Sequence, residues 1–214
     1  MSARQKKTTR SRIGLATYRE VEIKLRVADA SAMLRRLGSL GGTSHGRVLE
    51  QNTLYDTPES DFRSRGRLLR LRIETPSPGP GPVRAVLTAK APTPVAGADD
   101  SRHSKSRFKE RLERELVVHD SSRWPSIFRP LGLRPGFRYE KYRSQFRLPG
   151  VHVYLDETPA GNFLELEGAP RAIDRVAKAL GFTRLEYFRG TYWDVYAADC
   201  RRRGLVPRNM LFVR

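Results

Sequence analysis

The stretch YREVEIKLRV, residues 18–27, decides the fold. It places charged and aliphatic residues in strict alternation; the charged positions are Glu20, Glu22 and Lys24, and the aliphatic ones are Val21, Ile23 and Leu25. A period of two predicts a β-strand with one polar and one apolar face. A solvent-exposed strand can carry such a face through cross-strand charge pairs, so the pattern indicates a functional site only where other strands repeat it.

The composition fits a folded domain with an anionic partner. The chain has 214 residues, of which 38% are hydrophobic, and a net charge of +18. Residues 1–19 carry six basic residues and no acid, and residues 197–214 carry five arginines and one acid. The excess in the middle of the chain still favours an anion. We expect a basic disordered tail over 1–17 and a basic C-terminal tail over 197–214, which could attract nucleic acid or polyphosphate weakly.

Several features bear on the compartment. Cys200 is the only cysteine, so no intramolecular disulfide can form, which fits a reducing compartment. The first residues are charged and lack the apolar segment of a secretory signal. No stretch approaches the roughly 20 apolar residues that a membrane helix needs. We therefore expect a cytoplasmic protein without membrane association.

Hydrophobic periodicity and turn residues divide the chain into strands and helices. The expected strands are 18–27, 47–58, 66–74, 83–92, 107–120 and three within 134–168, and the expected helices are 28–42, 121–133, 169–182 and 183–198. The charge density of 107–120 would also suit a helix, but its alternation favours a strand. The elements predict one α+β domain over 18–196 whose sheet could close into a barrel, with loops at 75–82 and 93–106.

The alternation of charge recurs on nearly every expected strand. The positions are Arg70 and Arg72; Lys90; Arg111, Glu113 and Glu115; Lys141 and Arg143; Asp156; and Glu165 and Glu167. If helices cover the aliphatic faces, the charged faces point into the barrel. Because an unpaired charge in a dry interior costs several kcal/mol, the interior is either fully ion-paired or a wet tunnel that binds ligands of both signs.

The two signs suit two different ligands. Glutamates supply the hard oxygen ligands that Mg²⁺ or Mn²⁺ prefers. Arginine can bridge two phosphate oxygens and lysine acts as a point charge, so both suit a polyphosphate. A tunnel that holds a divalent metal and a polyphosphate would account for both signs at once.

The motifs resemble those of a known family. EVEIKL is similar to the ExExK signature of the CYTH superfamily, the triphosphate tunnel metalloenzymes, which includes class IV adenylate cyclases and thiamine triphosphatases. The motifs that follow in the family's order are QNTLYDTP, GRLLRLR, LTAKAP, RLERE, KYR, LDETPAGNFLELEG and GTYWDVY. The resemblance covers residues 18–196 and implies an antiparallel eight-stranded β-barrel flanked by helices. Dimers are common in the family, which leaves a homodimer open.

The resemblance also implies roles for single residues. The metal ligands would be Glu20, Glu22, Glu165 and Glu167, with Asp156 holding a second metal or orienting water. The triphosphate would be bound by Lys24, Arg70, Arg72, Lys90 and Arg143, with Lys141 as an alternative to Arg143. Arg111 would be a further contact, and Glu113 and Glu115 would line the tunnel. Lys24, Arg70, Arg72, Lys90 and Asp156 would carry the catalysis. The arginines could instead only pair with the acids, and Asp156 could belong to a turn.

The implied activity is that of a metal-dependent phosphohydrolase. Its substrate would be a triphosphate: inorganic tripolyphosphate, or a nucleoside or thiamine triphosphate. One alternative is a class IV adenylate cyclase, which would convert ATP to cyclic AMP and pyrophosphate in the same cradle. Another is a non-catalytic binder of polyphosphate or nucleic acid, which the acids oppose because without a metal they would repel phosphate. We expect the aromatic residues of 187–196 to pack in the core rather than form a base-stacking platform.

Overall fold

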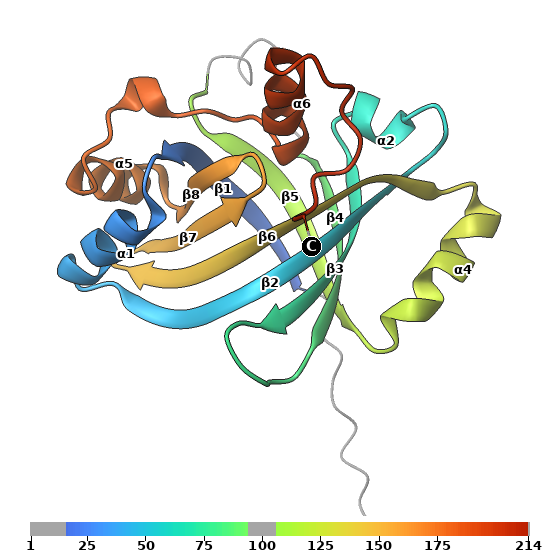
Figure 1. The fold of residues 1–214 in the computed structure, drawn as a ribbon, viewed down its shortest axis with the longest axis horizontal. Helices are drawn as coiled ribbons and strands as arrows, with labels where there is room; N and C mark the ends of the chain where they lie inside the picture. The colour runs from blue at the N-terminus through green and yellow to red at the C-terminus, as the bar shows by residue number, and fades with distance from the viewer. Residues whose placement is uncertain (1–15, 94–105, 214) are drawn as a thin grey trace, which may run out of the picture.

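Antiparallel strands close into a barrel in the computed structural model, which describes residues 16–93 and 106–213 (Figure 1). The order around the barrel is β1-β5-β4-β3-β2-β6-β7-β8. The strands are β1 (Ala16–Val27), β2 (Thr43–Asp56), β3 (Leu68–Pro76), β4 (Arg84–Pro92), β5 (Lys109–Val118), β6 (Arg134–Leu148), β7 (Val151–Thr158) and β8 (Gly161–Gly168). The expected antiparallel eight-stranded barrel is confirmed, and the ambiguous stretch 107–120 contains a strand that pairs with β1.

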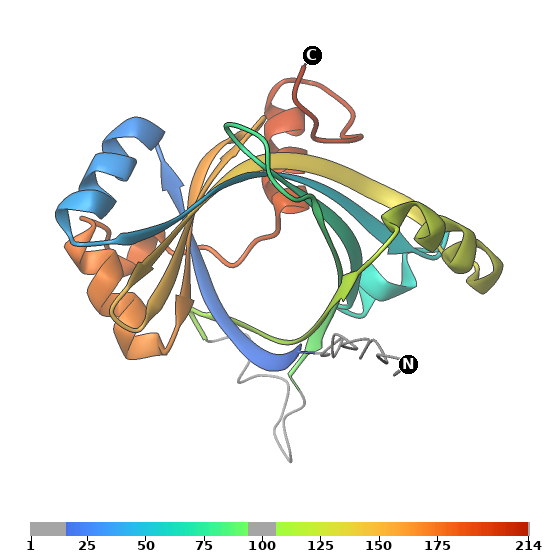
Figure 2. The same ribbon diagram turned by 90° about the horizontal axis from the view of Figure 1, so that it is seen from below.

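The helices lie around the outside of the barrel (Figure 2). They are α1 (Ala30–Ser39), α2 (Asp61–Ser64), α4 (Trp124–Phe128), α5 (Pro170–Ala179) and α6 (Tyr192–Arg202). Helix α2 is not among the helices expected from the sequence. The Asp56 carboxylate at the end of β2 accepts hydrogen bonds from the backbone N–H groups of Phe62 and Arg63, at 2.8 and 3.0 Å, and so holds this short turn in place. None of the helices in the described ranges is long and apolar enough to cross a membrane.

The main hydrophobic core lies outside the barrel, between its wall and the pair of helices α1 and α5. Ile23 and Leu25 of β1 are fully buried there, beside Leu164 of β8 and Ile173 of α5. Each such side chain contributes about 1.5–3 kcal/mol by leaving water. The aliphatic face of the opening stretch therefore turns outward to the helices, and its charged face turns into the barrel.

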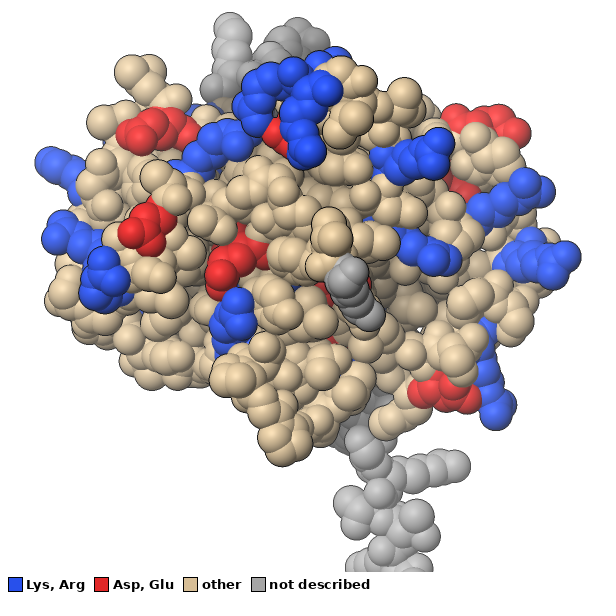
Figure 3. All heavy atoms as spheres, viewed as in Figure 1, with Lys and Arg blue, Asp and Glu red and all other residues tan. Residues whose placement is uncertain are grey.

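The segment after α6 returns to the barrel (Figure 1). The Met210 N–H donates to the Arg138 carbonyl at 3.0 Å, and the Glu140 N–H donates to the Met210 carbonyl at 2.9 Å. The pairing of β6 with β7 begins only at Tyr142, so this segment covers an edge of β6 that β7 leaves open. The boundary expected after residue 196 falls inside α6, and Figure 3 shows basic side chains gathered over that helix. The N-terminal tail up to residue 15 and the loop 94–105 lie outside the described residues.

Candidate active site

A cavity of about 520 Å³ lies inside the barrel and is lined from all eight strands. It brings together nearly all the residues that the sequence singled out. Those on its wall are Glu20, Glu22, Lys24, Arg70, Arg72, Lys90, Arg111, Glu113, Glu115, Lys141, Arg143, Glu165 and Glu167. Asp156 is not on the wall; it lies behind it and is fully buried.

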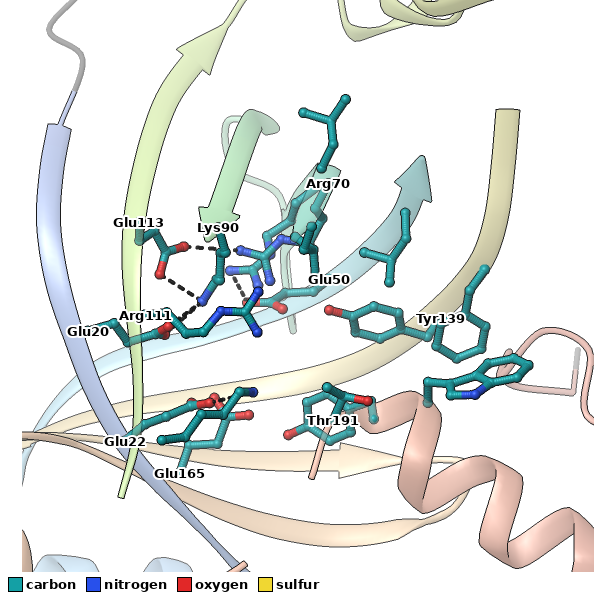
Figure 4. A pocket seen from close by; sticks show the side chains of 18 of the residues that line it. Glu20, Glu22, Glu50, Arg70, Lys90, Arg111, Glu113, Tyr139, Glu165 and Thr191 are labelled. Atoms are coloured by element: carbon teal, nitrogen blue, oxygen red, sulfur yellow. Dashed lines mark hydrogen bonds and ion pairs between the residues drawn. The ribbon is translucent and has the colours of Figure 1, made fainter. Parts of the chain in front are cut away.

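The order of the strands sorts these charges into two walls. The acidic wall is formed by the neighbours β8, β1 and β5; its acids are Glu165, Glu167, Glu20, Glu22, Glu113 and Glu115, and its cations are Lys24, Lys109 and Arg111. The basic wall is formed by β4, β3, β2 and β6; its cations are Arg84, Lys90, Arg70, Arg72, Lys141 and Arg143, and its acids are Glu50, Asp56 and Glu74. Figure 4 shows Glu20, Glu22 and Glu165 on one side of the cavity, with Arg70 and Tyr139 across from them.

Lysines tie the acidic wall together. Lys90 Nζ lies 2.7 Å from both carboxylate oxygens of Glu20 and 2.7 Å from Glu113. Lys24 Nζ lies 3.0 Å from Glu22 and 3.0 Å from Glu165. The interior is a cavity whose charges are extensively paired, so neither alternative left open by the sequence holds in its pure form. The binding of ligands of both signs stays a prediction.

The basic wall contains a carboxylate that is not among the residues expected from the sequence. Glu50 of β2 is fully buried and lies 3.1 Å from Arg72, 3.4 Å from Lys141 and 3.6 Å from Arg143. Burial alone would raise the pKa of Glu50, but these three cations hold it below its ordinary value. The signal was present in the sequence, since Glu50 and Asn52 share one face of the strand.

Lys109 is a second residue of the site that is not among those expected from the sequence. It continues the face of Arg111 and Glu113 one step toward the N-terminus of β5, and its Nζ lies 3.0 Å from Glu22. Burial lowers the pKa of Lys109, and the repulsion from Lys24 adds to this effect. Lys109 therefore brings a further positive charge to the acidic wall.

Asp156 holds the basic wall in place from behind. Its carboxylate accepts two hydrogen bonds from Arg143, at 2.7 and 2.6 Å, one from Lys141 at 2.9 Å and one from the Tyr192 hydroxyl. Tyr192, expected as a packing residue, thus also serves the site through its polar end. With four donors around its two oxygens, Asp156 orients the cations that face the cavity.

Two carboxyl groups of the acidic wall titrate near neutral pH. Burial raises the pKa of Glu167 to about 7, with repulsion from Glu20 and Glu22 adding to the effect. Burial and repulsion from Glu20 likewise raise the pKa of Glu113 to about 7, although Lys90 opposes the shift. Crowded carboxylates of this kind favour either a proton or a cation between them.

The residues of the acidic wall fit a divalent metal ion. Among the described residues no group of three acidic, histidine or cysteine side chains is gathered closely enough to hold an ion as the side chains now stand. The lysine pairs keep Glu20, Glu22 and Glu165 occupied, whereas in the described part of the chain Glu167 forms no salt bridge. The donor set contains only carboxylate oxygens, which Mg²⁺ and Mn²⁺ prefer, and a cation would relieve the repulsion that raises the pKa of Glu167.

The basic wall and its surroundings fit an anion. The Nε atoms of Arg70 and Arg111 are buried and have no hydrogen-bond acceptor among the described residues. Burial alone would raise the pKa of Tyr139, but Arg70, Lys141 and Arg72 lower it below its ordinary value. Buried donors without an acceptor can bind phosphate oxygens. Both carboxylate oxygens of Glu50 lie on the same wall and also lack a hydrogen-bond partner among the described residues, so they compete with an anion for these cations.

The fold and the site define a class of protein: closed antiparallel β-barrels whose internal cavity has an acidic wall and a basic wall. A family model described as the CYTH domain matches residues 18–186. The chain belongs to the CYTH domain family. No curated protein matches the chain.

Solved structures share the fold. The PH1819 protein from Pyrococcus horikoshii has a TM-score of 0.67 and 23% identity, with 84% of this chain and 99% of that chain covered. A Vibrio parahaemolyticus protein whose name suggests an adenylate cyclase has a TM-score of 0.64 and 19% identity, with 82% and 96% covered. HpAC1 from Hippeastrum, named as an adenylyl cyclase and described as having a dominant triphosphatase activity, has a TM-score of 0.56 and 18% identity, with 88% and 97% covered. At these identities the likeness shows the fold alone.

Proposed function

We propose that this chain is a divalent-metal-dependent triphosphatase. The observation that carries the proposal is the separation of an acidic and a basic wall across one cavity. A triphosphate and its metal ion carry the complementary charges, and each wall alone would repel one of the two. The dominant triphosphatase activity described for HpAC1 supports hydrolysis as the reaction.

The basic wall would bind the triphosphate. Arg70, Arg72 and Arg143 offer forked donors to phosphate oxygens, and Lys90 and Lys141 offer point charges. Lys24 adds a further point charge from β1 in the acidic wall. We assign Asp156 to positioning Lys141 and Arg143, in place of the metal-binding role implied by the resemblance, because its oxygens are already occupied. On binding, phosphate oxygens would replace the carboxylates that now pair with Lys24 and Lys90.

The acidic wall would hold the metal ion. We assign Glu20, Glu22, Glu165 and Glu167 as its ligands, with Mg²⁺ or Mn²⁺ as the ion. A bound divalent cation would supply stabilisation of the charge that develops on the transferred phosphoryl group. Glu22 and Glu165 would each lose one cation partner when phosphate draws Lys24 away from them, and Lys109 and Arg143 would remain beside them. The weaker pairing would favour metal binding, so substrate and metal would bind cooperatively.

A class IV adenylate cyclase is the second candidate, because the Vibrio parahaemolyticus neighbour is named for that activity. In a cyclase the 3′ hydroxyl of the ribose attacks the α-phosphate and pyrophosphate leaves. The same walls could stabilise that transfer, so the products distinguish the two candidates. The third alternative is a non-catalytic binder of polyphosphate or nucleic acid. Without a metal ion, the acidic wall would repel such a ligand.

The test is one set of parallel incubations. The purified protein is given tripolyphosphate, ATP or thiamine triphosphate with Mg²⁺, Mn²⁺ or EDTA, and phosphate, pyrophosphate and cyclic AMP are measured. Metal-dependent phosphate release without cyclic AMP is the expected result. Cyclic AMP with stoichiometric pyrophosphate would establish the cyclase instead, and the absence of every product would reject both enzymes. The cytoplasmic location, the homodimer and the contact of the tails with nucleic acid stay predictions.

A further inference from the structure

A buried threonine joins the acidic wall to the basic wall. Thr88 of β4 is fully buried, and it lies directly opposite Arg70 of β3 in one register and Glu115 of β5 in the other. Its hydroxyl accepts a hydrogen bond from Arg70 Nη2 at 3.2 Å and donates one to Glu115 Oε1 at 3.0 Å. One neutral group therefore links a cation of the basic wall to a carboxylate of the acidic wall.

Carboxylates engage Arg70 less closely than they engage its neighbour on the same face of β3. Arg72 lies 3.1 Å from Glu50. In the described part of the chain, the carboxylate oxygens paired with Arg70 lie 3.6 Å away on Glu115 and 3.7 Å away on Glu113. A hydrogen bond between nitrogen and oxygen needs about 2.7–3.2 Å, so both acids attract Arg70 without bonding to it directly.

The position of the Thr88 hydroxyl accounts for this separation. A hydroxyl group can donate one hydrogen bond and accept another at the same time, so it satisfies Arg70 and Glu115 together. Without the hydroxyl, both groups would lose a partner, and a direct bond between them would be the nearest replacement. The guanidinium would then turn toward β5 and away from the phosphate chain.

A second neutral group holds the same guanidinium from another strand. The hydroxyl oxygen of Tyr139 on β6 accepts a hydrogen bond from Arg70. The Nε atom of Arg70 is buried and has no acceptor among the described residues, and Arg70 lines the cavity. Thr88 and Tyr139 therefore fix the guanidinium from two sides and leave its Nε donor for a ligand.

We propose that Thr88 is a positioning residue whose hydroxyl keeps Arg70 apart from the carboxylates of β5 and so available to phosphate. This inference rests on the proposed function and adds a residue that does not itself line the cavity. It also gives a role to Glu115, which the resemblance placed only on the tunnel wall: Glu115 fixes the direction of the Thr88 hydroxyl.

Two substitutions separate the hydroxyl of Thr88 from its methyl group. Thr88→Val keeps the branched shape and removes the hydroxyl, whereas Thr88→Ser keeps the hydroxyl and removes the methyl group. Because the lost hydrogen bond involves a charged partner, Thr88→Val should raise KM for tripolyphosphate roughly 10- to 100-fold, and Thr88→Ser should stay within about threefold of the wild type. Calorimetric titration with tripolyphosphate in EDTA should show the same order of affinities without turnover.

The metal site supplies a control within the same variants. Thr88 contacts none of the four glutamates that we assign to the metal ion. At saturating tripolyphosphate, the concentration of Mg²⁺ that gives half-maximal activity should therefore stay at the wild-type value in Thr88→Val and Thr88→Ser.

A double variant tests whether Thr88 acts through Arg70. In Arg70→Lys the side chain carries a point charge without the forked donors that Thr88 orients. Adding Thr88→Val to Arg70→Lys should change KM for tripolyphosphate by less than about twofold, because two residues that act through one contact have non-additive effects. A residue that only packs in the barrel would instead add its full effect in the double variant.

The outcomes separate this inference from the proposed function. If the wild-type protein hydrolyses tripolyphosphate and Thr88→Val keeps its KM and affinity, only the positioning role is overturned. Equal losses in Thr88→Val and Thr88→Ser, or a full further loss on top of Arg70→Lys, would overturn it in the same way. Thr88→Ala, which also lacks the hydroxyl, gives the same test if urea unfolding shows that Thr88→Val does not fold. If the wild-type protein neither binds nor hydrolyses tripolyphosphate, the proposed function fails and the inference fails with it.

Discussion

Glu22 on β1 lies directly opposite Glu167 on β8 in the antiparallel register, yet the pKa values of the two carboxyl groups shift in opposite directions. Burial acts against both charges. Lys24 and Lys109 overcome it for Glu22 and hold its pKa below the ordinary value. Glu167 has no such partner among the described residues, and its pKa rises to about 7.

The raised pKa of Glu167 predicts a pH-dependent effect of Glu167→Gln on stability. The folded protein holds the proton on Glu167 more tightly than the unfolded chain does, so this contribution is complete below about pH 4.5 and is lost as the pH rises through about 7. The neutral glutamine escapes that loss. Without metal, the variant should gain about 1 kcal/mol at pH 8, or roughly 2–4 °C in Tm, and almost nothing at pH 5.

Thermal melts at the two pH values in EDTA check this prediction. Glu157→Gln is the matched control, because Glu157 does not line the cavity and pairs with Arg47 at a distance of 3.0 Å. It should show no gain at pH 8 relative to pH 5. Equal shifts in Tm at both pH values for Glu167→Gln would show that burial and repulsion in the acidic wall do not raise the pKa of Glu167.

Glu50→Gln should weaken the fold and strengthen anion binding. Glu50 is the carboxylate shared by Arg72, Lys141 and Arg143, and the loss of a buried ion-pair partner costs about 3–5 kcal/mol. A phosphate chain would then meet three cations without an internal competitor. Urea unfolding measures the first effect, and calorimetric titration with tripolyphosphate in EDTA measures the second.

Glu74→Gln provides the comparison for Glu50. Glu74 lies 3.6 Å from Arg72 and also contacts the exposed Arg84, so its charge is shared with solvent. Glu74→Gln should change the free energy of unfolding and the affinity for tripolyphosphate much less than Glu50→Gln does. Tripolyphosphate binding that is weaker in Glu50→Gln than in the wild type would contradict a phosphate site on the basic wall.

Asp156→Asn separates a positioning role from a metal-binding one. The substitution keeps the shape but weakens the hold on Lys141 and Arg143, and changes of this kind typically cost about 10- to 100-fold in activity. The concentration of Mg²⁺ that gives half-maximal activity should stay within about twofold of the wild-type value. A large rise in that concentration would show that Asp156 binds the metal ion and would contradict the positioning role.

Met210→Ala should destabilise the whole domain. Met210 is fully buried and packs with Phe137, Tyr139 and Tyr192, and such a truncation costs about 2–5 kcal/mol. Val213, three residues further along the same segment, is fully exposed, so Val213→Ala should leave the unfolding midpoint in urea unchanged. Equal midpoints for the two variants would show that the segment after α6 does not support the barrel.

The local pattern of charges predicted which faces of the strands are charged and a sheet that could close, and the resemblance to the CYTH superfamily supplied the antiparallel eight-stranded barrel. Strict alternation in β1, β3, β5 and β8 reports which side chains share a face, and the short turns report antiparallel neighbours. The pairing of β1 with both β5 and β8 joins residues far apart in the chain. Periodicity does not contain that information, so the division into an acidic and a basic wall appears only in the closed barrel.

The residues that were missed escape a search for short alternating clusters in two ways. Glu50 is the only charged residue between Arg47 and Asp56, whereas Lys109 is one of seven charges in the run RFKERLERE, where the alternation does not single it out. Asp156 belongs to the same alternation, and only the three-dimensional contacts show that its carboxylate is enclosed by Arg143, Lys141 and Tyr192. Tyr192 and Trp193 are read from sequence as packing residues, because hydrophobic patterns do not show where an aromatic ring meets a cavity.

The most direct test of a metal-dependent triphosphate site is the turnover of Glu167→Gln. With Mg²⁺ and tripolyphosphate or ATP, the wild-type protein and Glu157→Gln should release phosphate at equal rates, and EDTA should stop both. Removing one group that stabilises the transition state typically costs about 10²–10³ in rate, so Glu167→Gln should lose at least about 100-fold. Full activity in Glu167→Gln, or wild-type turnover that persists in EDTA, would contradict the assignment of the acidic wall to a catalytic metal.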